Sequence, residues 1–331
     1  MKAAILNQES YLLELKEVEI PTVKPFQVLV KLNSISLNHH ELWSIKEQNL
    51  KSDSHIIMGS DGAGEIVETG EGVDKRLIGN KVIINPSLNW GKSQRVQGPD
   101  YEILGYPTQG TFAEYISIDH RSVYIKPKYL SFEEAAAIPL AGLTAYRALF
   151  VRGEIEKNDT VLITGAGGGA ALFALQFAVH NGNKVYITSS SQFKINKAIS
   201  LGAVSGVNYK DNNWVKDLLV KIKGFDLIID SAGGEGFKDL AILANPGGRI
   251  SLFGRTAGKN ISLNASLVFW KQLSIHGTTM GKPEEFKKML DFLDFHKIKP
   301  VIDSCFAFEN IMGGFKRMDS SEQIGKIVVN F

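Results

Sequence analysis

A short glycine-rich segment near the middle of the chain has the residue types and spacing to bind a dinucleotide phosphate. An apolar run ending at Ile163 leads into Gly165, Gly167 and Ala170, which fit the pattern Gly-x-Gly-x-x-Gly/Ala, and an apolar helix is expected over Ala170–His180. Glycines let the turn tighten and let the backbone approach a pyrophosphate, while the N-terminus of the next helix attracts the anion. Such a turn is also an ordinary connection between a strand and a helix, so the residues that follow must show whether it binds a phosphate.

Those residues favour one form of the dinucleotide. A second apolar strand, Lys184–Thr188, begins after Gly182, which is placed to end the helix as a left-handed cap. An acidic residue about 20 positions past the glycines usually binds the free ribose 2′-OH of NAD, but none occurs between the turn and Asp211. Ser189–Ser191 and Lys194 follow the strand instead, and small donors with a cation suit the 2′-phosphate of NADP(H). The serines could also serve only to cap the next helix.

The length and charge of the chain are typical of an enzyme that acts on small molecules. Its 331 residues exceed the size at which one core usually stops growing, so two domains are expected. The 37 basic and 35 acidic residues give a net charge of +2, which offers no electrostatic footprint for nucleic acid or an anionic membrane. Met1–Asn7 resembles a strand rather than a signal peptide, and no apolar run approaches the roughly 18 residues of a membrane span. We therefore expect a cytoplasmic protein. The single cysteine, Cys305, lies in an apolar context and is expected to be buried.

The order of the predicted elements indicates an α/β protein with two parts. Up to about Ile125, short apolar runs are punctuated by Gly, Pro and Asn, which is typical of a β-rich, barrel-like domain. A helical stretch over Ser131–Phe150 follows, opened by a capping box at Ser131–Glu134 and interrupted at Pro139. Strands then alternate with helices, which predicts parallel crossovers and a doubly wound sheet. We expect domains at 1–125, completed by about 290–331, and at 126–289. The predicted strands are Val28–Leu32, Gly64–Gly70, Lys81–Ile84, Phe112–Ile118, Gly206–Tyr209, Phe225–Asp230, Gly248–Gly254, Leu273–Gly277 and Gly325–Val329, with a helix over Asn212–Ile222.

Several segments in one order carry a family resemblance over essentially the whole chain. They are Ser36–Trp43, Met58–Gly64, Ala135–Tyr146, the glycine turn, Gly206–Tyr209 and Gly325–Val329. Together they resemble the medium-chain dehydrogenase/reductase superfamily, with zinc-type alcohol dehydrogenase-like proteins and quinone oxidoreductases as the nearest branches. The resemblance implies a GroES-like catalytic domain split around a Rossmann domain, with the active site in the cleft between them.

Zinc-dependent members of this superfamily hold a catalytic metal at three positions, which the resemblance places at Asn38, Ser60 and Leu140. An amide, a hydroxyl and an alkyl group do not supply the thiolate and imidazole donors of such a site. The four-cysteine lobe of zinc-type relatives is also missing, because Ser87–Arg95 contains no cysteine. No zinc is therefore expected.

A rebuilt metal site is the alternative. Asp61, His39 and His40 offer ligands near the same positions. Adjacent histidines on an extended segment point to opposite faces, however, so they cannot easily chelate one ion.

Loss of the metal restricts the chemistry. Alcohol oxidation in this superfamily relies on zinc to stabilise an alkoxide, whereas hydride delivery to an enone or a quinone leaves a negative charge delocalised over the acceptor. We expect NADPH-dependent, zinc-independent reduction of quinones or α,β-unsaturated carbonyls, with the final proton taken from solvent or a nearby donor.

The resemblance also implies which residues bind the cofactor. Backbone groups of the turn should approach the pyrophosphate, and the residues after the second strand should bind the adenosine 2′-phosphate. Thr144 should lie by the nicotinamide, although helix packing is its alternative, and Tyr209 could equally be a core aromatic. The full expected set is Thr144, Gly165, Ala166, Gly167, Gly168, Gly169, Ala170, Ser189, Ser190, Lys194, Tyr209, Ser231, Phe253, Gly254, Gly277 and Thr278.

For the substrate, the catalytic candidate is Asn38, which could donate a hydrogen bond to a developing enolate oxygen. The further substrate candidates are His39, Trp43, Asn85 and Tyr101, and Trp43 may instead be an ordinary core residue. His40 and Glu41 lie where zinc-dependent relatives keep a hydroxyl relay residue and an acidic residue, so that relay is expected to be absent.

The sequence leaves two other functions open. One is an alcohol dehydrogenase that recruits zinc through His39, His40 or Asp61, and the other is a non-catalytic NADPH-binding sensor. The resemblance further suggests a homodimer in which edge strands pair near Leu252 or Ser262–Leu267.

Overall fold

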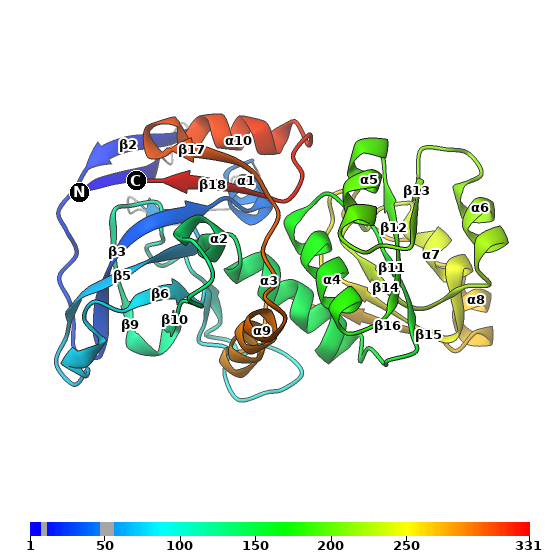
Figure 1. Cartoon of the computed structure of the whole chain (residues 1–331), viewed down its shortest axis with the longest axis horizontal. Coiled ribbons are helices and arrows are strands. Elements are labelled where there is room, and N and C mark those ends of the chain that lie inside the picture. Colours follow the sequence, from blue (N-terminus) through cyan, green and yellow to red (C-terminus); the bar gives the residue numbers. More distant parts are fainter. Residues whose placement is uncertain (8–11, 47–55) are drawn as a thin grey trace. The chain divides into compact units, whose positions relative to one another are not determined.

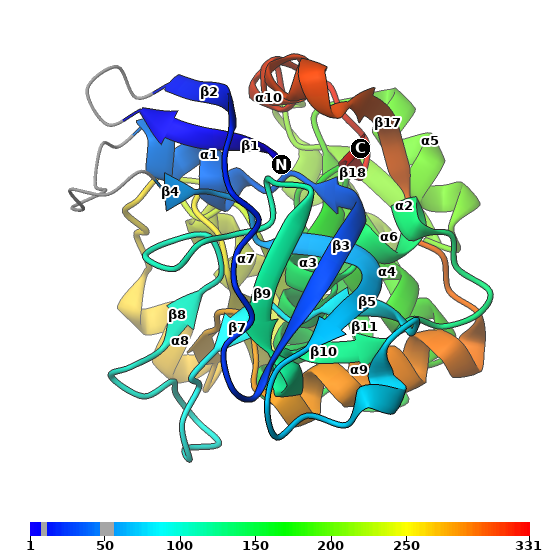
Figure 2. The same cartoon turned by 90° about the vertical axis from the view of Figure 1, so that its left-hand side faces the viewer.

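Short apolar runs that end at Gly, Pro or Asn form the sheets of the first part of the chain. The computed structural model describes residues 1–7, 12–46 and 56–331. Within these residues the largest sheet has seven strands, in the order β10, β6, β5, β3, β18 and β17, with β9 also on β3. Strand β3 pairs with β5 along one edge, and with β9 and then β18 along the other (Figure 2). The strands are β3 (Gln27–Ser36), β5 (Asp61–Thr69), β6 (Lys81–Ile84), β9 (Tyr115–Asp119), β10 (Val123–Ile125), β17 (Ile302–Ala307) and β18 (Lys326–Asn330).

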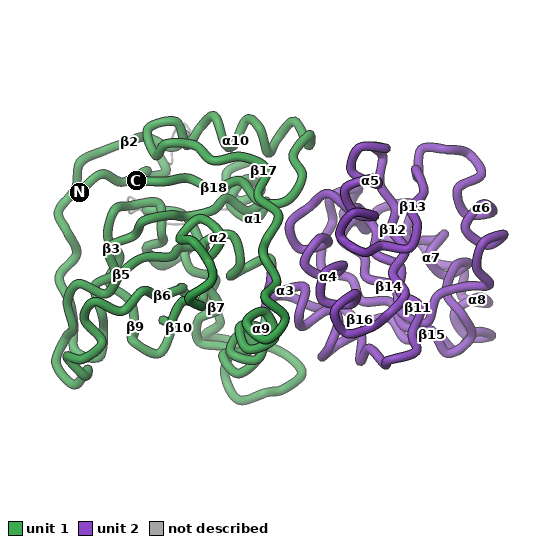
Figure 3. The backbone as a smooth tube through the Cα atoms, viewed as in Figure 1, with its two compact units in different colours: residues 1–141, 281–331 green, residues 142–280 purple. Residues whose placement is uncertain are grey.

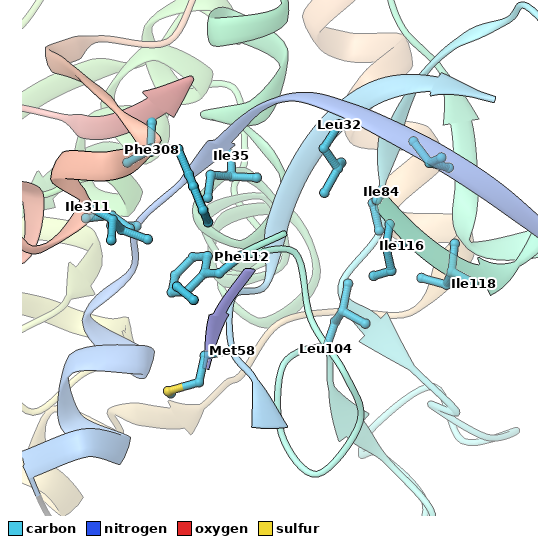
Figure 4. Close-up of a cluster of buried hydrophobic side chains, with 14 of the residues drawn as sticks. Leu32, Ile35, Met58, Ile84, Leu104, Phe112, Ile116, Ile118, Phe308 and Ile311 are labelled. Atoms are coloured by element: carbon cyan, nitrogen blue, oxygen red, sulfur yellow. The ribbon is translucent and has the colours of Figure 1, made fainter. Parts of the chain in front are cut away.

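Smaller sheets flank this one. The described strands β2 (Leu12–Glu17), β1 (Lys2–Asn7) and β4 (Ile56–Ile57) pair in that order, and β7 (Ser87–Leu88) pairs with β8 (Glu102–Ile103). Apolar side chains from both ends of the chain fill the space between these elements. Figure 4 shows Ile35 and Phe112 on the side of the cluster near Phe308 and Ile311, with Leu32 farther along it, and each of these side chains is buried.

The tail returns to the first part of the chain, as predicted. Strand β18 pairs antiparallel with β3, and a helix, α10 (Ile311–Asp319), lies between β17 and β18 in sequence (Figure 1). The expected burial of Cys305 is wrong, because its side chain is exposed. Alternation along β17 directs the neighbouring Phe306 toward the core, so Cys305 faces outward.

The middle of the chain forms a parallel sheet, as the alternation of strands and helices predicts. Its six described strands lie in the order β13, β12, β11, β14, β15 and β16. Figure 1 shows α4 and α5 on one side of the sheet and α6, α7 and α8 on the other. The strands are β11 (Thr160–Ile163), β12 (Lys184–Ser189), β13 (Ser205–Asn208), β14 (Phe225–Asp230), β15 (Ala244–Leu252) and β16 (Ser274–Gly277). The helices are α4 (Gly169–His180), α5 (Gln192–Ser200), α6 (Trp214–Lys221), α7 (Phe237–Leu243) and α8 (Ala265–Trp270).

The sheet edge expected for dimer contacts lies elsewhere than predicted. Leu252 is on β15, which pairs with strands on both sides, and residues 262–267 belong to a loop and the start of α8. In the described part of the chain, β16 is the strand at that end of the sheet.

Two compact units divide the chain (Figure 3). Unit 1 comprises Met1–Ala141 and Gly281–Phe331, and unit 2 comprises Gly142–Met280. These limits differ from the expected boundaries at 125/126 and 289/290, because residues 126–141 and 281–289 pack with unit 1. The Tyr129 hydroxyl, for example, donates to backbone carbonyls of Leu293 and Ile298, at 2.9 and 2.7 Å. The chain passes between the units within α3 (Pro139–Tyr146), which a π-helix over Arg147–Arg152 continues.

The helix that the sequence predicts after Ser131 begins at the expected residue. The capping box is formed: Ser131 Oγ accepts from the Glu134 amide at 3.1 Å, and Glu134 Oε2 accepts from the Ser131 amide at 2.8 Å. Helix α2 (Phe132–Ala136) ends before Pro139. The remaining long helix of unit 1 is α9 (Pro283–His296), and short 3₁₀ turns occur at Lys75–Leu77, His120–Ser122 and Phe308–Asn310.

The segment with the two histidines is helical, so its expected extended conformation is wrong. Helix α1 spans His39–Lys46, and its first turn is stabilised because Glu41 Oε2 accepts from the Asn38 amide at 2.7 Å. None of the helices among the described residues combines the length and apolar character needed to cross a membrane.

Candidate nucleotide site and buried polar cluster

The glycine turn follows β11 at the point where the strand order of the sheet reverses. Gly165 has φ +64°, and a Cβ built there would lie 2.8 Å from Ser231 Oγ, so both the conformation and the space require glycine. Gly168 precedes the first residue of α4, and the Ala166 amide donates to the Thr188 carbonyl at 2.8 Å. Ligands of open parallel sheets bind beyond the carboxyl ends of the strands at such a reversal. The turn is therefore a candidate phosphate site.

A buried carboxylate connects the two strands at this reversal. Asp230, the last residue of β14, accepts from Thr164 Oγ1 at 2.5 Å and from the Gly233 amide at 2.8 Å. Burial raises the pKa of Asp230. Because Ser231 Oγ in turn donates to the Thr164 carbonyl at 3.2 Å, the ends of β11 and β14 are held together.

The residues expected to bind a 2′-phosphate lie together beyond β12 and β13. The Tyr209 amide donates to the Ser189 carbonyl at 3.1 Å, and the Tyr209 side chain is 45% exposed, so its alternative role as a core aromatic is wrong. The aliphatic stem of Lys194 crosses the glycine turn: a Cβ on Gly167 would lie 2.7 Å from its Cδ and 3.4 Å from its Nζ. Ser191 occupies the N-cap position of α5 without a side-chain capping bond.

The loops after β14 and β15 pack backbone against backbone. A Cβ on Gly254 would lie 2.2 Å from the Ser231 carbonyl oxygen, and the Phe253 amide donates to the Asp230 carbonyl at 3.1 Å. The Thr278 amide, after β16, donates to the Leu252 carbonyl at 3.0 Å. Glycine is needed for this close approach, which forms a continuous rim at the carboxyl ends of the strands.

Every residue expected to bind the cofactor lies in unit 2. All but one lie at or beyond the carboxyl ends of strands of the parallel sheet. Thr144 is the exception, because it lies on α3, where its Oγ1 is 3.7 Å from Met280 Sδ and its side chain is buried.

Unit 1 contains a buried cluster of charged and polar side chains around Asn38. Lys326, the first residue of β18, donates from Nζ to Asp61 Oδ2 at 3.0 Å, to the Leu37 carbonyl at 2.9 Å, and to Asn38 Oδ1. Asn38 Nδ2 donates to Asp61 Oδ2 at 3.0 Å. Lys326 and Asp61 are 4% and 0% exposed, so this is a fully buried ion pair.

A second carboxylate, Glu41, borders the cluster. Its Oε1 accepts from the Ser60 amide at 3.1 Å and lies 3.4 Å from Asn38 Nδ2. The pKa of Glu41 is raised to about 7, mainly by burial and secondly by the nearby Asp61 carboxylate. Glu41 is therefore partly protonated near neutral pH.

The cluster leaves Asn38 without a spare donor. Both hydrogens of its amide are directed at carboxylates, one at Asp61 and one at Glu41, and its oxygen accepts from Lys326. The expected hydrogen bond from Asn38 to an enolate oxygen therefore has no available N–H in this arrangement.

The positions that hold zinc in metal-dependent relatives do come together, but they do not suit a metal. Asp61 Oδ1 accepts from the Leu140 amide at 2.8 Å, and Ser36 Oγ donates to Asp61 Oδ2 at 2.9 Å. Both Asp61 oxygens are thus in use, and the Lys326 ammonium lies beside them. Among the described residues, no group of three His, Cys, Asp or Glu side chains could hold a metal ion.

The other substrate candidates of unit 1 lie on different elements. The rings of His39 and Trp43 are 5.8 Å apart on α1. Asn85 precedes β7 and accepts from the Ser87 amide at 3.0 Å, while Tyr101 precedes β8, with its ring edge-on to Trp90 at 5.3 Å.

Lys326 is a member of the buried cluster that no sequence pattern indicated as a site residue. The available signal was a lysine at the start of an otherwise apolar strand, Lys326–Val329. A charged residue that begins a buried strand requires a partner, but only the pairing of β18 with β3 brings Asp61 and Asn38 to it.

The fold defines a protein with a β-rich unit and a doubly wound unit that carries a candidate phosphate site. Comparison with known proteins gives the same division into two parts. Residues 24–128 match the alcohol dehydrogenase GroES-like domain, and residues 169–294 match the zinc-binding dehydrogenase family.

Individual relatives match nearly the whole chain. The zinc-type alcohol dehydrogenase-like protein YogA of Leptosphaeria maculans is 34% identical, over 99% of this chain and 97% of its own. The 2-methylene-furan-3-one reductase of Solanum lycopersicum is 30% identical, over 95% of this chain and 74% of its own. The crystal structure of an NAD-dependent alcohol dehydrogenase is 33% identical, with a TM-score of 0.93 and complete coverage of both chains. The chain belongs to the medium-chain dehydrogenase/reductase superfamily of oxidoreductases.

Proposed function

We propose that this protein is an NADPH-dependent, zinc-independent reductase of α,β-unsaturated carbonyl compounds or quinones. The buried ion pair of Lys326 and Asp61 is the observation that carries the proposal, because it occupies the region where metal-dependent relatives hold zinc. Without a metal, the chemistry must suit an acceptor that can delocalise the negative charge it receives.

The rim at the carboxyl ends of the unit 2 strands favours a nicotinamide cofactor, and the position of Lys194 favours the form with a 2′-phosphate. The glycine turn begins a helix at the strand-order reversal, where a pyrophosphate binds. Lys194 lies against the same turn, beyond the strand end at which NAD-binding proteins usually have an acidic residue. When bound, NADPH would supply a hydride from its nicotinamide ring.

The reaction balances without a protein acid. The hydride adds to the β-carbon of the C=C–C=O group, the C=C electrons move toward the carbonyl oxygen, and the enolate takes a proton from water at the α-carbon. The products are the saturated carbonyl compound and NADP⁺. The protein would bind and orient the acceptor and stabilise the charge on its oxygen.

The names of two relatives point in different directions. The relative from Solanum lycopersicum is a 2-methylene-furan-3-one reductase, a name that favours C=C reduction. The crystal structure that is 33% identical to this chain is of an NAD-dependent alcohol dehydrogenase, a name that favours alcohol oxidation. A second candidate function is therefore NAD-dependent alcohol oxidation with zinc recruited through Asp61 or the histidines of α1.

One experiment separates these functions. The purified protein is analysed for zinc and then mixed with NADPH or NADH and a panel of 1,4-benzoquinone, 9,10-phenanthrenequinone and a 2-alkenal, while the absorbance of the reduced cofactor is followed. We expect NADPH oxidation by protein that lacks zinc. Stoichiometric zinc with NAD-dependent alcohol oxidation would support the second candidate, and tight NADPH binding without turnover would support a sensor.

We also propose that the protein forms a homodimer through β16. The described part of the chain pairs this strand on one side only, and the preceding helix exposes Trp270 (79%) and Phe269 (59%). An open edge beside exposed aromatic side chains is usually covered. Light scattering coupled to gel filtration would test this, and a monomer at micromolar concentration would contradict it.

A further inference from the structure

We propose that Asp230 is a positioning residue of the cofactor site, which holds the glycine turn in the conformation that meets the pyrophosphate. This assignment rests on the proposed binding of a nicotinamide cofactor to unit 2. Asp230 is 2% exposed, and both of its carboxylate oxygens accept hydrogen bonds from the protein. It would therefore act through the turn, without touching the nucleotide.

The first observation is that this carboxylate joins two glycine-containing turns. Its Oδ1 accepts at 2.5 Å from Thr164 Oγ1, and Thr164 directly precedes Gly165 of the turn after β11. Its Oδ2 accepts at 2.8 Å from the amide of Gly233, which has φ +60° in the turn after β14, and the Ala232 amide also donates to the carboxylate. One buried side chain thus fixes the ends of two neighbouring strands of the sheet.

The second observation is the strength of this bond compared with the others at the start of the turn. On the β12 side, the Gly165 amide donates to Thr188 Oγ1 at 3.4 Å. On the β14 side, Thr164 Oγ1 accepts from the Ser231 amide at 3.3 Å and donates to Asp230 at 2.5 Å. A hydroxyl that donates to a carboxylate at such a distance makes a charge-assisted bond, which is roughly twice as strong as a bond between neutral groups. Asp230 is therefore the main side-chain support of the residue that begins the turn.

The third observation is what the turn itself supports. The first amides of a helix have no partner within the helix, and the positive end of the helix dipole lies with them. Their placement in α4 depends on the residues that join Gly165 to the start of the helix at Gly169. A binding site must be held to within about 0.5 Å, and time spent in other conformations lowers the affinity for the ligand. A turn released from Asp230 should therefore bind a pyrophosphate more weakly.

Strand β14 carries a matched control, Asp226, near its amino end. Asp226 Oδ2 accepts from the Thr160 amide at 2.9 Å, and its Oδ1 accepts from Asn245 Nδ2 at 2.7 Å. Because Thr160 is the first residue of β11, this carboxylate also joins β14 to β11, but at the end of the strands away from the glycine turn. Loss of Asp226 should weaken the sheet without disturbing the turn.

The test compares Asp230→Ala with Asp226→Ala and adds two further variants. Asp230→Asn keeps an oxygen that can accept from the Gly233 amide, and Thr164→Val removes the bond to the glycine turn while the carboxylate stays in place. For each variant and the parent protein, the dissociation constants of NADPH and NADH are measured by calorimetric titration, together with the thermal unfolding midpoint. The kcat at saturating NADPH is measured with the best acceptor of the panel.

We expect Asp230→Ala to weaken NADPH and NADH binding by the same factor, about tenfold or more, because the two cofactors share the pyrophosphate and a hydrogen bond to a charged group is lost. Its kcat at saturating NADPH should equal that of the parent, since Asp230 does not reach the reacting atoms. Thr164→Val should have a similar effect, and it carries the test if Asp230→Ala does not fold. Asp230→Asn should retain most of the affinity. Asp226→Ala should bind both cofactors as the parent does, even where its unfolding midpoint falls.

Four outcomes would overturn the assignment. Parental affinities in Asp230→Ala and Thr164→Val would show that the turn keeps its conformation without this bond, while the cofactor site would stand. Equal losses of affinity in Asp226→Ala would show that general weakening of the sheet is responsible. A loss in Asp230→Asn as large as in Asp230→Ala would show that the charge, rather than the acceptor, is needed. A parent protein that binds neither NADPH nor NADH would remove the proposed cofactor, and the assignment with it.

Discussion

Lys326 and Asp61 form an ion pair that joins the last strand of the chain to the start of β5, with 3.0 Å between Nζ and Oδ2 and almost no exposure of either residue. Removing one partner of a buried pair leaves the other charge without compensation. We expect Lys326→Met to lower the free energy of unfolding by about 3–5 kcal/mol, measured by urea denaturation.

Lys287→Met is the matched control for this substitution. Lys287 pairs with Asp291 on the surface of α9, where both side chains are more than 60% exposed, and exposed pairs of this spacing contribute only about 0.3–0.5 kcal/mol. A Lys326→Met protein as stable as the control would show that the buried pair is not needed for the fold.

The raised pKa of Glu41 predicts a dependence of stability on pH. A carboxyl whose pKa rises from its ordinary 4.5 to about 7 on folding holds a proton that the unfolded chain has lost, so stability falls as the pH rises through this window. The loss is on the order of 3 kcal/mol and is complete above about pH 7.

Glu41→Gln isolates this effect. Its denaturation curves should lack the decrease between about pH 4.5 and 7 that the parent protein shows. Burial also lowers the pKa of His40 from its ordinary 6.5, which makes stability rise with pH in the range just below that value. The effect of Glu41 is therefore read from the difference between the pH profiles of the two proteins. Identical pH profiles would contradict the raised pKa.

Gly165 of the glycine turn and Gly236, at the start of α7, provide a matched pair of substitutions. Gly165→Ala should abolish measurable NADPH binding, since φ is +64° and the new Cβ would lie 2.8 Å from Ser231 Oγ. Gly236→Ala should be tolerated, because Gly236 has helical backbone, no atom lies within 4 Å of the added Cβ, and the residue is not among those expected to bind the cofactor. Titration of protein fluorescence with NADPH measures both, and equal affinities would contradict the placement of the phosphate at this turn.

Lys194 should distinguish the two cofactors. We expect Lys194→Ala to weaken NADPH binding about tenfold, the loss of one charge-assisted contact, and to leave NADH binding unchanged. Lys197→Ala, on the exposed side of the same helix, should affect neither cofactor. Calorimetric titration with each cofactor tests this, and equal losses for NADPH and NADH would place Lys194 at the pyrophosphate instead.

Local patterns predicted much of the fold correctly. The strand at Phe225–Asp230, the capping box at Ser131 and the helix after the glycine turn depend on neighbouring residues, and each is present. The α1 helix was missed, because its start depends on Glu41 reaching the Asn38 amide. The exposure of Cys305 was missed because alternation on an edge strand, rather than its apolar neighbours, decides which side chains face inward.

The sequence by itself determined the two-part organisation, the superfamily resemblance and the turn that is suited to a phosphate, because periodicity and glycine spacing act over a few residues. Only the tertiary structure decided what surrounds Asn38. Asp61 and Lys326 are 265 positions apart, and they meet because β3 pairs with both β5 and β18. Burial of such distant charges depends on strand pairing, which no local pattern encodes. That pairing directs both hydrogens of the Asn38 amide at carboxylates.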